Sequence, residues 1–240
     1  MDKSQTISVV IPAYNESENI KLLIEELIDV LGKIGSEYDI IIVDDNSSDD
    51  TSDKVLEMKK NYNNIRLIRF KQNHGQTAAL DAGFRNATGN IIITLDADLQ
   101  NDPSDIPMML SSLKEADAVC GWRFNRQDSM VKRISSVVAN GVRNWATQEN
   151  IHDTACALKV FKKECIDKIK LYKGFHRFLP TLAKIEGYKV LEVKVNHRPR
   201  KYGDSKYNIW NRLFKSLYDL IVVRWMMKQQ LNYQEDMLEL

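Results

Sequence analysis

The stretch "ISVVIPAYNESENIKLLIEELIDVLGKIG", residues 7–35, decides the fold that the sequence predicts. Its beginning has the pattern of a short buried strand, which we expect to stop at Pro12 because proline cannot donate to a strand ladder. After a polar turn, Ser17 is the expected N-cap of a helix that closes at glycines. The apolar positions of that helix recur every three or four residues and share one face: Ile20, Leu23, Ile24, Leu27 and Leu31.

This strand–helix step recurs three more times in the first half of the chain. Alternating buried strands and amphipathic helices are typical of a mostly parallel sheet with helices on both faces, so we expect an α/β fold. The further steps are a strand at 38–45 with a helix at 51–62, a strand at 65–70 with a helix at 75–89, and a strand at 90–98 with a helix at 102–116.

The second half of the chain is less regular. Residues 117–124 have the pattern of a fifth strand, a helix is expected near 175–187, and a final helix is expected to begin near Tyr207. A length of 240 residues suits one sizeable domain with a small appendage. We place the domain at 1–206 and a C-terminal amphipathic helix with its tail at 207–240.

Cysteine content and hydropathy exclude several classes of protein. The three cysteines are odd in number and show no C-x-x-C spacing, which argues against a disulfide framework or a zinc site and suits a reducing cytosol. No apolar run approaches the roughly 18 residues of a membrane span, and the N-terminal run is too short for a signal peptide. We therefore expect a cytoplasmic protein without a spanning helix.

The net charge of +1 conceals an asymmetry between the two halves of the chain. Residues 1–120 hold 11 Lys and Arg against 21 Asp and Glu, whereas residues 121–240 hold 23 against 12. An acidic half suits a metal cation and a basic half suits phosphate or an anionic surface, although charge drift without function would give the same counts. No nucleic acid partner is expected.

Three polar clusters follow predicted strands, at residues 12–17, 44–50 and 96–100. In open α/β sheets ligands bind outside the carboxyl ends of the strands, so we expect a site where these clusters meet. Two common nucleotide-binding motifs, G-x-x-x-x-G-K-[ST] and G-x-G-x-x-G, do not follow any predicted strand. Phosphate groups must therefore be held by other means.

The third cluster has the composition of a metal site. In an extended segment Asp96 and Asp98 point to the same side, and Gln100 continues the row. Hard oxygen ligands without His or Cys suit Mg²⁺ or Mn²⁺ that also binds substrate phosphates. The alternative, that these acids cap the next helix, fits Asp102 before Pro103 better than it fits the other two.

Six motifs, taken together, resemble a known family. The chain is similar to the family 2 glycosyltransferases of GT-A fold, and among them to the polyprenyl-phosphate glycosyltransferases that include dolichol-phosphate mannose synthase. The motifs are "VVIPAYNESENI" (9–20), "VDDNSSDDT" (43–51), "GQTAALDAGFRNATG" (75–89), "TLDADLQNDP" (94–103), "GWR" (121–123) and "RPRKYGDSKY" (198–207). The resemblance runs from about residue 6 to about residue 228 and implies metal-dependent transfer of a sugar from GDP-mannose or a UDP-hexose to dolichyl or undecaprenyl phosphate in a membrane.

The resemblance also implies roles for individual residues. The nucleoside would be held by Pro12, Tyr14 and Glu16 together with Asp44 or Asp45. The Mg²⁺ or Mn²⁺ on the diphosphate would be organised by Asp96, Asp98 and Gln100. Phosphate groups of donor and acceptor would meet the basic residues Arg123, Arg133, Arg200 and Lys206.

The chemistry of such a transfer agrees with the residues present. A phosphate monoester, whose second pKa is about 6, is already largely an anionic nucleophile at neutral pH and needs little help from a base. Three alternatives stay open at this point: a saccharide hydroxyl acceptor, which would require a catalytic base, a non-catalytic nucleotide-sugar-binding subunit, and, more weakly, a nucleotidyltransferase. The oligomeric state is not indicated by the sequence.

The final helix offers a way to approach a membrane from one side. Its apolar positions are expected to share a face that either packs on the core or lies in a bilayer interface, with Asp219 off that face. We expect peripheral attachment at the inner face of the membrane, with residues 129–145 as a second candidate for contact. The apolar positions are Ile209, Trp210, Leu213, Phe214, Leu217, Leu220 and Ile221.

Overall fold

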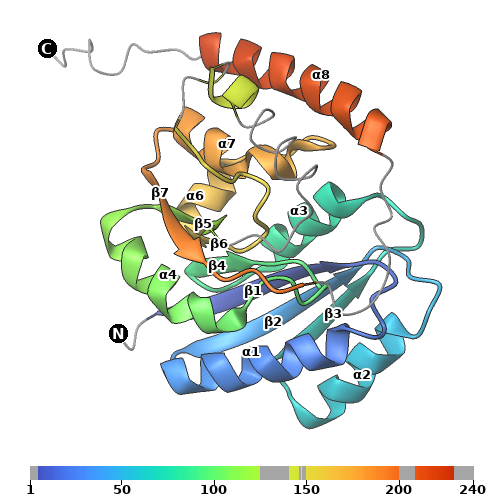
Figure 1. Ribbon diagram of the computed structural model, residues 1–240. Helices are drawn as coiled ribbons and strands as arrows, with labels where there is room; N and C mark the ends of the chain where they lie inside the picture. The colour runs from blue at the N-terminus through green and yellow to red at the C-terminus, as the bar shows by residue number, and fades with distance from the viewer. Residues whose placement is uncertain (1–4, 125–140, 146, 148–149, 200–208, 230–240) are drawn as a thin grey trace, which may run out of the picture.

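The computed structural model of the chain describes residues 5–124, 141–145, 147, 150–199 and 209–229, the side chains of 209–217 excepted. Within these residues lies one seven-stranded sheet of order β3-β2-β1-β4-β6-β5-β7 (Figure 1). Its strands are β1 (Thr6–Ala13), β2 (Glu37–Asp44), β3 (Ile65–Arg69), β4 (Ile91–Thr94), β5 (Ala118–Arg123), β6 (Lys159–Lys162) and β7 (Val190–Val195). The predicted division into a domain at 1–206 and an appendage at 207–240 stays a prediction.

The sheet is mostly parallel, as predicted, with one reversed strand. β6 runs antiparallel to both of its neighbours, β4 and β5, whereas the other neighbouring strands are parallel. β1 also extends further than expected, because Pro12 lies inside it and pairs with Val43. The last pair between β1 and β4 is Val10 with Thr94, so at Pro12 the strand has a neighbour on one side only, and a missing N–H is tolerated there.

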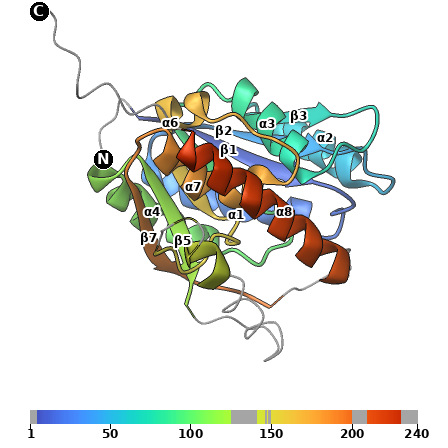
Figure 2. The ribbon, with the colours of Figure 1, turned by 90° about the horizontal axis from the view of Figure 1, so that it is seen from above.

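Helices cover both faces of the sheet (Figures 1 and 2). One face carries α1 (Ile20–Ile34), α2 (Thr51–Asn61) and α4 (Ile106–Ser112), and the other carries α3 (Gln76–Asn86), α6 (Lys163–Lys168) and α7 (Leu179–Ile185). α8 (Ile209–Lys228) lies outermost on the second face. Short 3-10 turns are η1 (Pro103–Asp105), η2 (Leu113–Glu115) and η3 (Phe175–Phe178). The predicted N-cap at Ser17 is wrong, because α1 begins at Ile20 after the N-cap Asn19.

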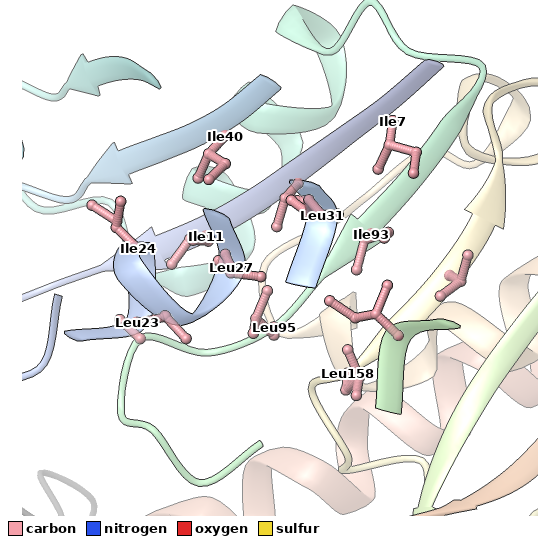
Figure 3. Close-up of a cluster of buried hydrophobic side chains, with 14 of the residues drawn as sticks. Ile7, Ile11, Leu23, Ile24, Leu27, Leu31, Ile40, Ile93, Leu95 and Leu158 are labelled. Carbon is pink, nitrogen blue, oxygen red and sulfur yellow. The ribbon is translucent and has the colours of Figure 1, made fainter. Parts of the chain in front are cut away.

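Side chains of the central strand alternate between two hydrophobic clusters. Ile7, Val9 and Ile11 point to the cluster beneath α1, where the five predicted apolar positions of that helix are all buried (Figure 3). Val10 points to the other cluster, which includes Leu80 of α3. Burial on both faces explains why β1 is mostly apolar, since a strand with helices on each side has few solvent-facing positions; its buried polar residue, Ser8, bonds to Asp39.

The described part of α8 packs with a different side from the one expected. Leu220, which was predicted on the apolar face, is buried in the second cluster together with Val223, which was not, whereas Ile221, predicted on the same face as Leu220, is exposed. Asp219, predicted to point away, is buried and forms an ion pair with Arg177 at 3.2 Å. The period of the helix was right and its rotation wrong, because a buried ion pair can draw an acid inward that hydropathy alone places in water. Within the described residues, no helix is long and apolar enough to cross a membrane.

We predict that Gly89→Ala destabilises the fold by about 1–3 kcal/mol through overpacking against a strand that cannot move aside. A Cβ at Gly89 would lie 2.6 Å from the backbone nitrogen of Ser8 and 2.8 Å from the carbonyl carbon of Ile7. Urea unfolding measures the loss. The control is Gly32→Ala inside α1, where a Cβ meets nothing within 4 Å and alanine is the better helix former, so stability should hold or rise. Equal stability of the two variants would contradict the close approach.

Candidate functional site

Strand direction brings the predicted site segments to one edge of the sheet. β1, β2, β4, β5 and β7 share one direction, so their carboxyl ends meet there, together with the first residue of the reversed strand β6, Lys159. Polar residues follow each of these strand ends: Tyr14 to Glu16 after β1, Asp44 and Asp45 at the end of β2, Asp96 and Asp98 after β4, Arg123 at the end of β5, and Asn196 to Arg198 after β7.

The loop after β4 is a turn and not the extended segment that we expected. β4 ends at Thr94, the chain turns at Ala97 and Asp98, and Leu99 has the left-handed φ of 60°. The carboxylate of Asp98 closes the turn by accepting the backbone N–H of Gln100 at 3.2 Å. The predicted extended row of Asp96, Asp98 and Gln100 is therefore wrong. The turn nevertheless keeps the two carboxylates close enough to repel each other.

Electrostatics single out Asp96. Burial, with the nearby charge of Asp98 as a second cause, raises the pKa of Asp96 to about 6, although the cations Lys159 and Arg123 act in the opposite direction. The side chain of Gln76, the first residue of α3, donates a hydrogen bond of 2.7 Å to Oδ1 of Asp96. A carboxylate that is dehydrated and faces a second carboxylate is more stable when a cation is added beside it.

The two acids suit a divalent cation that is shared with a substrate. Mg²⁺ and Mn²⁺ bind to one or two carboxylates together with phosphate oxygens, so a pair is sufficient. Three or more His, Cys, Asp or Glu side chains placed to hold a metal are not found anywhere in the described part of the chain. Gln100 contributes its backbone to the turn, and its predicted role as a ligand stays a prediction.

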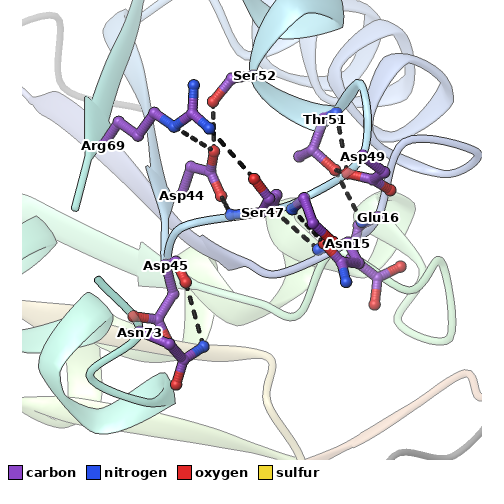
Figure 4. Close-up of polar contacts among 11 residues, drawn as sticks. Asn15, Glu16, Asp44, Asp45, Ser47, Asp49, Thr51, Ser52, Arg69 and Asn73 are labelled. Atoms are coloured by element: carbon purple, nitrogen blue, oxygen red, sulfur yellow. Dashed lines mark hydrogen bonds and ion pairs between the residues drawn. The ribbon is translucent and has the colours of Figure 1, made fainter. Parts of the chain in front are cut away.

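Asp44 and Asp45 hold the loops around the site (Figure 4). Asp44 is fully buried and accepts bonds from the backbone of Ser47 at 2.8 Å and from the hydroxyl of Ser52, with Arg69 at 3.5 Å. Asp45 accepts the backbone N–H groups of His74 and Gly75, each at 2.7 Å. The nucleoside role predicted for one of them stays a prediction, and both have a structural role as well.

The loop after β1 is tied to the loop after β2. Asn15, with φ at 53°, accepts the backbone N–H of Ser48 at 2.8 Å, and the N–H of Glu16 donates to Thr51 at 2.9 Å. Pro12 is buried in β1, whereas the ring of Tyr14 is 40% exposed and can be reached by a ligand. The negative charge of Glu16 is one of the influences that raise the pKa of Asp96, which places this loop beside the acidic pair.

Arg123, the one predicted phosphate-binding cation among the described residues, forms a buried fork with an acid. Its Nε and Nη2 lie 2.7 and 2.9 Å from the two carboxylate oxygens of Asp153. The side chains are 13% and 4% exposed, so this pair is part of the wall of the site. The other three predicted cations, Arg133, Arg200 and Lys206, lie outside the described residues.

The segment that leads toward residue 200 is fastened to the acidic loop. The backbone N–H of Arg198 donates to the carbonyl of Gln100 at 2.9 Å. Its guanidinium reaches Glu26 at 2.7 Å and Asp102 at 2.8 Å. Asn196 donates its backbone N–H and its side-chain amide to the two carboxylate oxygens of Asp105, at 2.7 and 3.0 Å. The chain therefore leaves β7 alongside the loop that carries Asp96 and Asp98.

Sequence reasoning missed three residues that matter for this geometry. Gln76, Lys159 and Arg198 each act on the acidic loop from a distant part of the chain. Lys159 offers the clearest signal in hindsight, because it is a lysine inside the apolar run "ALKVF" and is buried. A buried lysine is rare unless it is paired, and here its ammonium donates to the carbonyl of Cys156.

Comparisons with known proteins agree with this geometry. A family model described as glycosyl transferase family 2 matches residues 8–170. The chain belongs to this family. An undecaprenyl-phosphate 4-deoxy-4-formamido-L-arabinose transferase of Proteus mirabilis (strain HI4320) is 38% identical over 223 residues, 92% of this chain and 68% of that protein. A dodecaprenyl-phosphate galacturonate synthase of Rhizobium johnstonii (strain DSM 114642 / LMG 32736 / 3841) is 35% identical over 235 residues, 94% of this chain and 68% of that protein.

A solved glycosyltransferase has the same fold. The glucosyl-3-phosphoglycerate synthase of Mycobacterium tuberculosis, crystallised with Mn²⁺, UDP and phosphoglyceric acid, matches with a TM-score of 0.72 over 95% of this chain and 80% of that one. At 17% identity the likeness shows a shared fold alone. The predicted GT-A fold, the enzyme class and the resemblance to polyprenyl-phosphate glycosyltransferases are confirmed for this family 2 chain.

We predict that Asp96→Asn stabilises the metal-free protein at pH 7 by about 1–3 kcal/mol. The raised pKa means that the folded protein holds this proton more tightly than the unfolded chain, so its unfolding free energy falls as pH rises from about 4 to about 6. The gain from the substitution should therefore be full above pH 6 and small at pH 4. Urea unfolding in EDTA at both pH values measures it.

The matched control for that experiment is Asp102→Asn. Burial alone would raise the pKa of Asp102, but bonds from Ser104 and the charge of Arg198 hold it below its usual value. Its charge therefore stabilises the fold above about pH 4, and its loss should cost stability at pH 7 and little at pH 3. A destabilised Asp96→Asn variant at pH 7 would contradict the electrostatic description of the acidic loop.

Proposed function

We propose that the chain is an inverting glycosyltransferase that moves a sugar from a nucleotide-diphosphate donor to a polyprenyl phosphate. The observation that carries this proposal is the pair of partly buried Asp96 and buried Asp98 at the carboxyl edge of the sheet, in a chain whose 38% identical relative is an undecaprenyl-phosphate sugar transferase. GDP-mannose and UDP-hexoses are the donors to test first, and dolichyl or undecaprenyl phosphate the acceptors.

The donor is proposed to lie across the ends of β1, β2 and β4. Tyr14 is exposed at this edge, and Glu16 and Asp45 border the same loops, which suits contacts to the nucleoside. Asp96 and Asp98, with Gln100, would hold Mg²⁺ or Mn²⁺ against the diphosphate. Such an ion, when bound, supplies Lewis-acid stabilisation for charge that builds on the leaving nucleotide. Gln76 orients the Asp96 carboxylate through its hydrogen bond.

The acceptor needs cations more than it needs a base. A phosphate monoester is an anionic nucleophile at neutral pH, and direct displacement at the anomeric carbon inverts the sugar. Arg123, Arg133, Arg200 and Lys206 are proposed to bring the acceptor and the departing phosphates together. The contacts of Arg198 with Gln100 and Asp102 support this proposal for Arg200 and Lys206, because the described segment that contains Arg198 ends at residue 199, beside the acidic turn. The enzyme would work as a peripheral protein at the inner face of a membrane.

We predict that purified protein transfers sugar to a short-chain polyprenyl phosphate in detergent with at least one of these donors, and that Asp98→Asn or EDTA abolishes the transfer. The substitution removes a charge that the metal requires, while the turn can still accept the N–H of Gln100. Radiolabelled transfer and thermal shift with Mn²⁺ and donor are the measurements. Asp29→Asn on the exposed side of α1 is the control. Full turnover in metal-free buffer would contradict the metal-dependent mechanism. Turnover with a saccharide and without a polyprenyl phosphate would show that the acceptor is a saccharide hydroxyl.

We predict that Arg200→Ala and Lys206→Ala each lower the transfer rate by about 10² or more, as expected for preorganised charge stabilisation. Donor affinity should change far less, because the proposed nucleoside contacts lie on the other loops. Initial rates and donor binding are measured on the same samples. Lys33→Ala, which removes an exposed charge on α1, should leave both unchanged. Unaltered transfer rates in both variants would remove Arg200 and Lys206 from the mechanism, and lost donor affinity would assign them to the donor.

A further inference from the structure

The outward side of α8 is apolar and aromatic. Tyr218, Ile221 and Trp225 are 68%, 62% and 61% exposed, and their spacing of three and four residues places them on one side of the helix. The views in Figures 1 and 2 show α8 as the outermost helix of its face of the sheet. Large apolar side chains gathered in one exposed strip are uncommon on a soluble surface and mark a place of contact.

The rotation of α8 is set by its inner side. Leu220 and Val223 are buried in the second hydrophobic cluster, which also includes residues of α3 and α7. Asp219 is drawn inward by Arg177 and lies close to Gly174, where an added Cβ would be 2.6 Å from its carboxylate. The helix therefore uses its other side for the core, and the exposed aromatic strip is not a consequence of a loosely placed helix.

A second element extends the strip. Residues 141–145 form a helical turn beside α8, coloured olive in Figure 1, with Val142 44% exposed and Trp145 77% exposed. The guanidinium of Arg224, from α8, lies 5.5 Å from the centre of the Trp145 ring. This contact joins the two elements into one surface, which we call the interfacial patch: Val142, Trp145, Tyr218, Ile221 and Trp225.

The exposed charges on the described end of α8 are positive. Between residues 218 and 229 the charged side chains are Asp219, Arg224 and Lys228, and the acid is the buried one. The exposed charge on this stretch is therefore carried by a lysine and a partly exposed arginine. Tryptophan and tyrosine next to cations match the boundary of a bilayer, where rings lie at the depth of the headgroups and cations meet anionic lipid. A protein that bound here instead would need a surface that is both acidic and apolar.

We propose that the interfacial patch docks this chain onto the surface of an anionic bilayer. This inference rests on the proposed function, because an enzyme that uses a polyprenyl phosphate must reach its acceptor at a membrane surface. Attraction to anionic lipid and burial of the rings are both modest, so binding should be reversible and should weaken with salt.

The test is sedimentation with vesicles of phosphatidylcholine alone or with 30% phosphatidylglycerol, a composition of about one anionic lipid in three. The parent protein should bind the anionic vesicles preferentially. The double substitution Trp145→Ala with Trp225→Ala should lower the partition coefficient about tenfold or more, because two exposed rings are lost and no buried contact is touched. Leu56→Ala is the matched control, an exposed apolar residue of α2 on the opposite face of the sheet, and should bind like the parent.

The inference would be overturned if the parent protein showed no preference for anionic vesicles, or if the double variant bound them as well as the parent does. It would also be overturned if the parent were a dimer that the double substitution dissociates, because a second copy of the chain would then cover the patch. Thermal melts of both variants check that the fold is kept. Transfer to a short-chain acceptor in detergent is measured in parallel and should be unchanged in the double variant. Loss of that transfer in the parent would defeat the proposed function and leave the vesicle result standing, so the two failures are distinguishable.

Discussion

The repulsion between Asp96 and Asp98 is the constraint on which the rest of the site depends. Two carboxylates in one turn, one of them dehydrated enough for its pKa to rise to about 6, form an arrangement that the fold alone does not favour. Such electrostatic repulsion is relieved when a cation binds beside the two carboxylates, and groups with strongly shifted pKa values are concentrated at functional sites. The acidic turn is thus the part of the sheet edge where the fold holds a charge at an electrostatic cost.

The surrounding structure limits how that repulsion can be relieved. Asp45 fixes the backbone at His74 and Gly75, directly before Gln76, and Gln76 in turn holds one oxygen of Asp96. Asp45, at the end of β2, is therefore connected to the acidic turn through two hydrogen-bonded steps. The positive charges of Lys159 and Arg123 partly offset the repulsion between the two carboxylates. Each of these cations also has a partner of its own: Lys159 donates to the carbonyl of Cys156, and Arg123 pairs with Asp153. Rotation of Asp96 away from Asp98 would break this arrangement.

Local periodicity was sufficient to predict the alternating strands and helices and the edge of the sheet where the polar clusters meet. It was sufficient because each of β1 to β4 is followed by its own helix, so the signal for each step lies within about 30 residues. The reversal of β6 was not predictable in this way, because β6 pairs with two strands that precede it by more than 35 residues. The bonds of Gln76 and Arg198 to the acidic loop are long-range in the same sense.

The errors have physical reasons too. The acids after β4 were expected in an extended row, but a carboxylate can bond the backbone two residues ahead, and Asp98 does so to close a turn. On α8 a period of 3.6 locates an apolar strip without saying which of two strips faces the core, and the ion pair between Asp219 and Arg177 decides it.

Proton release on metal binding tests the central claim most directly. Mn²⁺ is titrated into the metal-free protein by calorimetry at pH 6 and at pH 8, each in two buffers of different ionisation enthalpy. A cation at the acidic turn must displace the proton that Asp96 holds near pH 6, so we predict release of about half a proton at pH 6 and close to none at pH 8. In Asp96→Asn this pH dependence should vanish. Equal proton release at both pH values, or the same release from the variant, would contradict the account.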